Sequence, residues 1–457
     1  MSLLEKLRDA TRGTPYEGKI YLVGGIVRDR IMGITEEEDC DLVLEGNAEE
    51  LADFLYSKGI SDHKPVTYSR FRTAMIQVEG FQVEIAGARK ESYTPESRKP
   101  NVAPATLEED VFRRDFTINT LLENLHTGEI LDLTGMGRAD IKAGIIRTPK
   151  DPSITFEDDP LRMLRAIRFA ARFGFNIEEK TYRAIAEKAA RLKIISSERI
   201  RDEFVKMLMT SRAADAMEML HETGLLKMFA PELENMRGVE QNIYHIYDVW
   251  THTMKTLEAL PDDAGLELRL AALFHDIGKP STKTVDENGN VHFYSHQIVG
   301  AKMTSEILSR LKFDNETIRK TAKIVEMHLR VGEYDSSWSD TAVRRFIRDA
   351  GDELNLLFTL TKADKAAGNT EMPSANIQEL EQRIAEISVQ IDVRAINSPL
   401  NGQEIMAMLG IGEGRIVGEI KDYLVNEIIE GRLSPNDKDS ARKIVMQKWG
   451  KQCTSNS

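Results

Sequence analysis

The chain has little of what an extracellular or membrane protein needs. Its 457 residues include only two cysteines, Cys40 and Cys453, at opposite ends of the sequence. Two such distant thiols cannot form a metal cluster, and a structural disulfide is not expected in a reducing compartment. The longest apolar stretches, such as 270–274, are far too short to span a bilayer, and no signal peptide is apparent. We therefore expect a cytoplasmic protein with no membrane association.

The chain also lacks a positive net charge. Its formal charge of −13 argues against a nonspecific nucleic-acid binder but leaves room for a local basic face. Basic clusters occur at Arg89-Lys90, Arg98-Lys99, Arg113-Arg114 and in the series Arg162, Arg165, Arg168 and Arg172. Taken alone, such clusters are more typical of a solvated surface than of a binding site.

The pattern of the sequence changes near residue 150. Before it, we expect strands at 19–23 and 41–44, a helix at 48–59, and a hairpin of 72–78 and 81–86 around the turn Glu79-Gly80. The tract 89–104 carries three prolines and no periodicity, which predicts a mobile loop. From residue 158 onward, apolar residues recur at helical spacing. A small α/β head therefore precedes a long helical body.

A glycine pair in the head is a candidate phosphate site. Gly24 and Gly25 follow an expected strand and open a helix that carries Arg28. Glycines there let backbone amides approach a phosphate closely, and a helix N-terminus adds positive potential. The alternative is an ordinary structural turn.

Two aspartates nearby form a candidate metal site. Asp39 and Asp41 are two residues apart, so on a strand their carboxylates would lie on the same face. Adjacent carboxylates repel each other unless a cation lies between them, as in a two-metal phosphoryl-transfer site for Mg²⁺. Glu84, on a later strand, is a candidate third ligand. The alternative is an acidic loop, because three glutamates precede the pair.

The combination of these motifs resembles the signature of the DNA polymerase β-like nucleotidyltransferases. The segment 113–119, Arg-Arg-Asp-Phe-Thr-Ile-Asn, resembles the second motif of class II tRNA nucleotidyltransferases and bacterial poly(A) polymerases. That motif selects a ribose and helps to hold the nucleotide, which implies nucleotide binding by Arg114, Asp115 and Asn119. The segment 132–147 is similar to the third, hinge-like motif of the same family.

The segment 157–165 resembles the fourth motif. Asp159, Arg162 and Arg165 recur every three residues, which predicts that they share one face of a helix. A carboxylate accepts from an exocyclic amine and a guanidinium donates to a ring nitrogen, and cytosine and adenine offer that pattern. We therefore expect Asp159 and Arg162 to select CTP and ATP, with Arg165 steadying the base or the triphosphate. The alternative is a charged helix with internal ion pairs. The segment 198–203 resembles a fifth motif, to which we assign structural support.

Histidines and aspartates in the middle of the chain resemble the HD phosphohydrolase superfamily, in which a divalent metal activates water on phosphate esters. On this resemblance the ligands are His252, His275, Asp276 and Asp364, with His296 and His328 as further candidates. Related enzymes act on phosphate monoesters and 2′,3′-cyclic ends. A purely structural HD domain is the alternative.

The resemblance extends from Tyr21 to Leu433, with the motifs in family order. It implies an α/β nucleotidyltransferase head (1–150), an all-α neck (151–238), an HD domain (239–370) and a helical C-terminal tRNA-binding region (371–457). Glycines at 410, 412 and 414 would permit close approach to a sugar-phosphate chain, or would simply cap helices. The implied reaction is Mg²⁺-dependent addition of C and A to the 3′ end of tRNA, from CTP and ATP.

Other functions are also compatible with the sequence. The chain could add only A beside a separate CC-adding enzyme, or it could be a poly(A) polymerase, although that branch usually lacks an HD domain. In the family, the loop at 90–106 supports the switch to A addition, and its full length here disfavours a CC-only enzyme. The chain could also act mainly as an HD phosphohydrolase, or bind RNA without catalysis.

Overall fold

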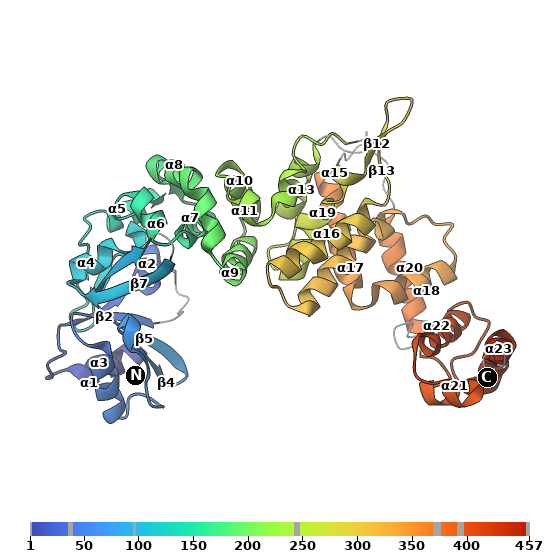
Figure 1. Ribbon diagram of the computed structural model, residues 1–457, viewed down its shortest axis with the longest axis horizontal. Coiled ribbons are helices and arrows are strands. Elements are labelled where there is room, and N and C mark those ends of the chain that lie inside the picture. Colours follow the sequence, from blue (N-terminus) through green and yellow to red (C-terminus); the bar gives the residue numbers. More distant parts are fainter. Residues whose placement is uncertain are drawn as a thin grey trace. The chain divides into compact units, whose positions relative to one another are not determined.

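The computed structural model describes residues 2–34, 40–94, 97–241, 247–368, 376–390 and 397–453. The chain divides into two compact units, which are described separately below (Figure 1). The first unit comprises Met1–Arg237, Asp262–Arg269 and Glu306–Asn315. The second comprises Gly238–Pro261, Leu270–Ser305 and Glu316–Ser457.

The first unit contains a seven-stranded sheet of order β3-β4-β5-β2-β1-β8-β9. Its strands are β1 (Ile20–Val23), β2 (Cys40–Leu44), β3 (Val66–Tyr68), β4 (Thr73–Val78), β5 (Phe81–Gly87), β8 (Leu122–Asn124) and β9 (Ile130–Leu131). Strands β2 and β5 pair in parallel, and the other neighbours are antiparallel. The helices of the head are α1 (Leu3–Thr11), α2 (Gly25–Met32), α3 (Ala48–Ser57), α4 (Leu107–Phe112) and α5 (Gly137–Ala143), with the short helices η1 (Ser69–Phe71) and η2 (Thr117–Asn119).

Alternation along the strands gives the sheet two different faces. Leu42 and Ile85, which pair across β2 and β5, are buried on the face on which α3 packs. On the other face, Val43 belongs to a small core with Val111 of α4. Asp41 is two residues before Val43 and therefore lies on this second face, beyond the part that α4 covers.

The expected hairpin is confirmed. Strands β4 and β5 pair in register around Glu79 and Gly80, whose φ angles are 51° and 85°. Positive φ at both positions is what a two-residue hairpin turn of matching twist requires. Cys40 is buried, as a small apolar residue would be.

The prediction of a loop at 89–104 is wrong. This tract forms an antiparallel ribbon of β6 (Arg89–Thr94) and β7 (Ser97–Pro104), in which Arg89 pairs with Pro104. Proline is tolerated in a strand where its missing N–H would point away from the partner strand. In a two-stranded ribbon both strands are edges, so prolines do not exclude the pairing.

The neck of the first unit is helical and centres on α7. Its elements are α6 (Pro152–Asp158), α7 (Leu161–Phe173), α8 (Glu179–Lys188), η3 (Ala189–Ile194), α9 (Ser197–Leu208), α10 (Ala213–Glu222), α11 (Leu226–Phe229) and α12 (Pro231–Glu234), with the parallel pair β10 (Ile145–Ile146) and β11 (Asn176–Ile177). Helix α7 packs on α9 and α10, and the ring of its Phe169 meets Phe116 of the head edge to face. The neck therefore shares a core with the head.

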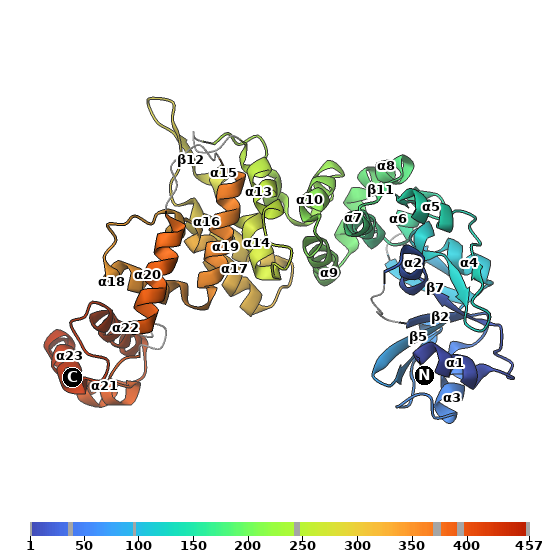
Figure 2. The same ribbon diagram turned by 180° about the vertical axis from the view of Figure 1, so that it is seen from behind.

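The second unit is almost wholly helical. Its elements, with α14 and α16 shared between the units, are α13 (Val249–Glu258), α14 (Leu266–Phe274), α15 (Lys279–Thr282), the hairpin β12 (Lys283–Val285) and β13 (Val291–Phe293), α16 (His296–Arg310), α17 (Asn315–Gly332), α18 (Asp340–Ala350), η4 (Gly351–Glu353), α19 (Leu354–Ala367), α20 (Ile377–Gln390), α21 (Gly402–Leu409), α22 (Arg415–Ile429) and α23 (Lys438–Cys453). Figure 2 shows α13, α14, α16, α17 and α19 gathered together.

The last three helices have a small core of their own, which includes Leu400, Ile420 and Val445. Gly410 ends α21 in the left-handed conformation, and Gly414 immediately precedes α22. These two glycines therefore serve as helix caps. Among the helices that the structure describes, none is long and apolar enough to cross a membrane.

Candidate functional site

Two of the three predicted carboxylates lie on the second face of the sheet, the face of Asp41 and Val43, where α4 does not cover it. This part is called the open face below. Asp41 on β2 pairs in register with Glu84 on β5, so the two side chains lie side by side on the same face. Asp41 is half-buried and Glu84 is exposed. Carboxylate oxygens are the ligands that Mg²⁺ prefers, so this pair fits the ion. Asp39 lies outside the described residues.

The predicted glycine turn lies directly beside this pair. Gly24 has a φ of 78°, and a Cβ built on it would lie 3.7 Å from Oδ2 of Asp41. Helix α2 begins at the next residue, and no side chain caps its first amides. Those amides are donors for an anionic ligand, and the helix dipole favours negative charge there. A phosphate at this helix end would lie close to the Asp41 carboxylate.

Arg28 is buried beneath the turn. Its guanidinium donates to both carboxylate oxygens of Asp29, at 2.7 and 2.9 Å, and to Oδ1 of Asn119 at 2.7 Å. It also lies over the ring of Phe173, 4.7 Å from the ring centre. Only 4% of the residue is exposed. These contacts fix Arg28 below the helix end that was expected to receive a triphosphate.

Asp115 continues this network from the head to the neck. Its Oδ1 accepts from the Asn119 amide at 3.0 Å, and its Oδ2 pairs with Arg165 of α7 at 2.6 Å. Burial alone would raise the pKa of Asp115, but Arg165 and the Asn119 amide outweigh it and hold the pKa well below its usual range. The predicted residues Arg28, Asn119, Asp115 and Arg165 therefore form one continuous chain of contacts.

Glu203 of α9 completes the chain. It is the last residue of the segment 198–203, to which structural support was assigned, but it was not named as a site residue. Its carboxylate lies 2.8 Å from Nε of Arg168 and 3.9 Å from Nη1 of Arg165, and 4% of the residue is exposed. A signal was available, because Glu203 follows Ile200 by three residues and precedes Phe204 on the buried face of an amphipathic helix. A carboxylate in that position predicts a buried cationic partner.

The predicted shared helix face of Asp159 and Arg162 is wrong. Helix α7 begins at Leu161, and Asp159 ends α6 in an extended conformation, with φ −142° and ψ 103°. Pro160 causes this break, because proline excludes the residue before it from the helical region. The Asp159 carboxylate accepts from the Leu161 amide at 3.1 Å and lies 3.3 Å from Arg199.

Arg162 and Arg114 also have protein partners. The Arg162 guanidinium is buried and donates to the carbonyl oxygens of Arg113, at 2.8 Å, and Thr155, at 3.4 Å. Arg114 pairs with the buried Asp110 at 2.8 Å. Burial would raise the pKa of Asp110, but the guanidinium groups of Arg114 and Arg113 lower it. In this structure, Arg162 therefore links the fourth motif to the second, and Arg114 is held by a carboxylate of α4.

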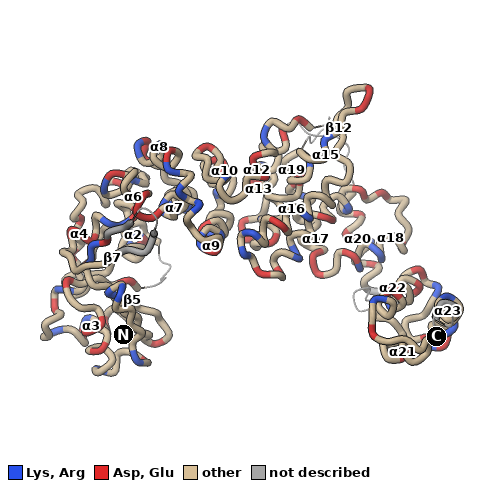
Figure 3. The backbone as a smooth tube through the Cα atoms, viewed as in Figure 1, with Lys and Arg blue, Asp and Glu red and all other residues tan. Residues whose placement is uncertain are grey.

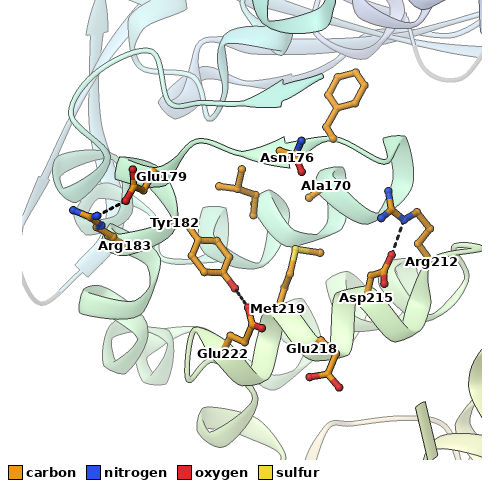
Figure 4. A pocket seen from close by; sticks show the side chains of 12 residues that line it. Ala170, Asn176, Glu179, Tyr182, Arg183, Arg212, Asp215, Glu218, Met219 and Glu222 are labelled. Carbon is orange, nitrogen blue, oxygen red and sulfur yellow. Dashed lines mark hydrogen bonds and ion pairs between the residues drawn. The ribbon is translucent and has the colours of Figure 1, made fainter. Parts of the chain in front are cut away.

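Helix α7 is basic along its length, as Figure 3 shows. The neck also contains a pocket of about 660 Å³, which lies between α7, α8 and α10 (Figure 4). Its floor is apolar, and four carboxylates line it against two guanidinium groups. The Tyr182 hydroxyl donates to Glu222 at 2.6 Å, and Arg212 pairs with Asp215. This excess of acidic groups does not suit a phosphate.

The second unit brings all six predicted HD residues together. Two groups of three ligand atoms, each group within 4.8 Å, are formed by His252, His275 and Asp364 and by Asp276, His296 and His328. The groups adjoin each other, since Nε2 of His275 lies 3.2 Å from Oδ2 of Asp276. Five of the six residues are buried. This cluster of imidazoles and carboxylates fits a divalent metal.

Backbone carbonyls orient three of the histidines. Nδ1 of His275, His296 and His328 lies 2.7–2.8 Å from a carbonyl oxygen three residues earlier. A carbonyl only accepts, so each Nδ1 carries a proton and each Nε2 faces the cluster, where a metal would bind it. Burial, with His275 nearby, lowers the pKa of His328 to about 3, so this imidazole is neutral. Lys279 donates to Asp276 at 2.6 Å and balances part of the negative charge.

Models of three protein families match separate parts of the chain. The poly A polymerase head domain matches residues 20–147, the probable RNA and SrmB-binding site of polymerase A matches 174–237, and the HD domain matches 242–369.

Similarity to individual proteins covers nearly the whole chain. An A-adding tRNA nucleotidyltransferase of Deinococcus radiodurans is 30% identical over 462 residues, which cover 96% of this chain and 97% of that protein. A CC-adding tRNA nucleotidyltransferase of Thermus thermophilus is 32% identical over 79% of this chain and 80% of its own. The crystal structure of the Bacillus stearothermophilus CCA-adding enzyme in complex with CTP has the same fold, with a TM-score of 0.66 at 24% identity over 100% of this chain and 98% of that chain.

Proposed function

Because the chain belongs to the class II tRNA nucleotidyltransferases with an HD domain and is an enzyme of that type, we propose that it adds C and A to the 3′ end of tRNA. CTP and ATP are the proposed donors, and pyrophosphate leaves. The observation that carries this proposal is the position of Asp41 on an open sheet face, against the glycine turn at the start of α2.

The proposed reaction uses the head. The 3′ hydroxyl of tRNA loses its proton to water, and its oxygen attacks the α-phosphorus of the nucleotide. The bond between the α-phosphorus and the oxygen that bridges to the β-phosphorus breaks, and the β- and γ-phosphates leave as pyrophosphate. Asp39, Asp41 and Glu84 would hold Mg²⁺, which when bound acidifies the attacking hydroxyl and neutralises the triphosphate. The amides at Gly25 would receive the triphosphate, and Arg28, which is paired with Asp29 in this structure, would help to hold it.

Residues of the second and fourth motifs would hold the nucleotide. Asp115 and Glu203 orient Arg165 from two sides, so its guanidinium is fixed before a ligand arrives. We propose that Asp159 and Arg162 read the base, with Arg114 and Asn119 contributing to the site. To do so, Asp159 and Arg162 must exchange their present backbone partners for the base edge. The C-terminal helices are proposed to bind the body of the tRNA.

Addition of A alone is the second candidate, because the A-adding relative matches this chain over nearly its full length. The two candidates are separated by incubating the protein with Mg²⁺, labelled CTP or ATP, and transcripts that lack CCA, end in C, or end in CC. We expect extension of all three to a complete CCA end. Extension of only the CC-ending transcript, by ATP, would establish the A-adding enzyme. Failure to extend any transcript, when a characterised CCA-adding enzyme extends them, would overturn both.

We further propose that the HD cluster binds divalent metal and hydrolyses phosphate monoesters or 2′,3′-cyclic phosphates at RNA ends. The observation in favour is the inward orientation of three Nε2 atoms beside two carboxylates. When bound, the metal would activate water for attack on phosphorus.

Replacing His275 by alanine is expected to weaken the binding of Mn²⁺ to the second unit by more than roughly 10–100-fold. Loss of a hydrogen-bond partner of a metal ligand costs that much, and loss of the ligand itself should cost more. Calorimetric titration of the whole chain, with Asp41→Asn in the background to remove the head site, measures this affinity. His292→Ala is the matched control, since His292 is half-exposed on β13 and lies outside the cluster. Equal Mn²⁺ affinity in His275→Ala and the control would contradict the metal site.

A further inference from the structure

The open face of the sheet extends from the carboxylates to an edge strand with exposed apolar side chains. Val66 of β3 pairs with Met75, Met75 pairs with Glu84, and Glu84 pairs with Asp41. Directly paired residues lie on the same face, so this row crosses four strands on the side of the proposed metal site. Tyr68 is two residues beyond Val66 and lies on the same face.

Two large side chains on this edge are about half exposed. Tyr68 is 49% exposed and Val66 is 47% exposed. Among the described strands, β3 pairs only with β4, so its outer edge is open. Exposed apolar side chains on an edge strand invite unwanted pairing, and proteins usually place charges or proline there instead. Their exposure on the face that carries the proposed metal site favours a ligand there.

The sheet order places this edge opposite the proposed triphosphate site. Gly24 follows β1, which lies on one side of β2. Strands β5, β4 and β3 lie on the other side of β2, in that order. The Asp41 carboxylate therefore lies between the turn at Gly24 and the edge at Tyr68. An in-line displacement at phosphorus puts the leaving group and the attacking oxygen on opposite sides. If pyrophosphate departs toward Gly24, the attacking 3′ end arrives from the side of β3.

The distance suits the last nucleotides of an RNA strand. Val66 is three strands from Asp41, which at ordinary strand spacing is about 14 Å. An exposed aromatic ring and cation follow the strand in η1, where Arg70 lies over the ring of Phe71. Aromatic faces beside exposed cations are the usual means of binding single-stranded nucleic acid.

We propose that Tyr68 and Val66 form a stacking platform for the terminal bases of the RNA acceptor. This inference rests on the proposed transferase function and identifies the acceptor side of the same site. The platform holds the acceptor strand and takes no part in the chemical step. It is indifferent to the identity of the incoming nucleotide.

The test compares Tyr68→Ser and Tyr68→Phe in the full-length protein. In Tyr68→Ser, the KM for a CC-ending tRNA transcript is expected to rise about tenfold, because stacking of a single base contributes an effect of this size. The KM for ATP should not change, and Tyr68→Phe should restore the KM for tRNA. Tyr56→Ser is the matched control, since Tyr56 is 45% exposed on α3, which covers the opposite face.

A spectroscopic measurement separates stacking from a general structural effect. A transcript with 2-aminopurine as its terminal base should lose fluorescence on binding to the wild-type protein and to Tyr68→Phe, and keep it with Tyr68→Ser. An unchanged KM for tRNA and unchanged quenching in an active Tyr68→Ser enzyme would overturn the platform alone. A wild-type protein that extends no transcript would overturn the transferase function, and the platform with it.

Discussion

Replacing Asp41 by asparagine is expected to lower the rate of nucleotide addition by about a thousandfold or more, because a hard anionic ligand of Mg²⁺ is lost at the reacting phosphate. Such a fall corresponds to about 4 kcal/mol of transition-state stabilisation. The substitution keeps the side-chain shape at a half-buried surface position, so the fold should be unaffected. The measurement is single-turnover extension of a CC-ending transcript at saturating ATP.

The matched control for this experiment is Asp53→Asn. Asp53 is exposed on α3, which packs on the opposite face of the sheet, so its replacement removes the same charge without touching the site. Activity of Asp41→Asn within tenfold of this control would show that Asp41 does not hold the metal. Glu84→Gln then tests the third ligand, and a smaller loss is expected because Glu84 is the more exposed of the pair.

Replacing Glu203 by alanine is expected to destabilise the first unit by about 3–5 kcal/mol, since it leaves a buried guanidinium without its carboxylate. The guanidinium is that of Arg168, whose side chain is 10% exposed and lies 2.8 Å from Glu203. Arg165 would also lose one of the two carboxylates that orient it. Glu198→Ala, at an exposed position in the first turn of the same helix, should cost less than about 1 kcal/mol.

The position of the tryptophans makes this prediction specific to one unit. All three, Trp250, Trp338 and Trp449, belong to the second unit. In urea titrations, the far-ultraviolet circular dichroism transition of Glu203→Ala should therefore have a lower midpoint than that of Glu198→Ala, and tryptophan fluorescence reports separately on the second unit. A dichroism transition that coincides with that of Glu198→Ala would refute the buried ion pair.

Local patterns in the sequence were sufficient for the centre of the head. The run 19–23 ends at a glycine pair, and Glu79-Gly80 separates two alternating segments, so β1, β4 and β5 could be placed from neighbouring residues alone. The ribbon of β6 and β7 could not be predicted this way. Its pairing depends on each strand having a free edge for proline, which is a property of the sheet and not of the segment.

Side-chain partners were harder to predict than elements. His252 and Asp364 are 112 residues apart, and only a family resemblance could place them together before the structure did. Asp159 was assigned to a helix that Pro160 prevents it from joining. Tyr68 gave no signal, because a three-residue edge strand with exposed side chains shows no alternation of buried and exposed positions.

The division of the chain into units has a consequence for its modularity. The segments Asp262–Arg269 and Glu306–Asn315 belong to the first unit, although the sequence on either side of each belongs to the second. Arg269 is buried and donates to the carbonyl oxygens of Leu208 and Thr210 at the end of α9, and Arg310 pairs with Glu232. A fragment that ends at Arg237 would leave these groups without their partners. The head and neck are therefore not an independently folding fragment that ends at one residue. A single cut in the gene could not add or remove the HD region without disturbing the first unit.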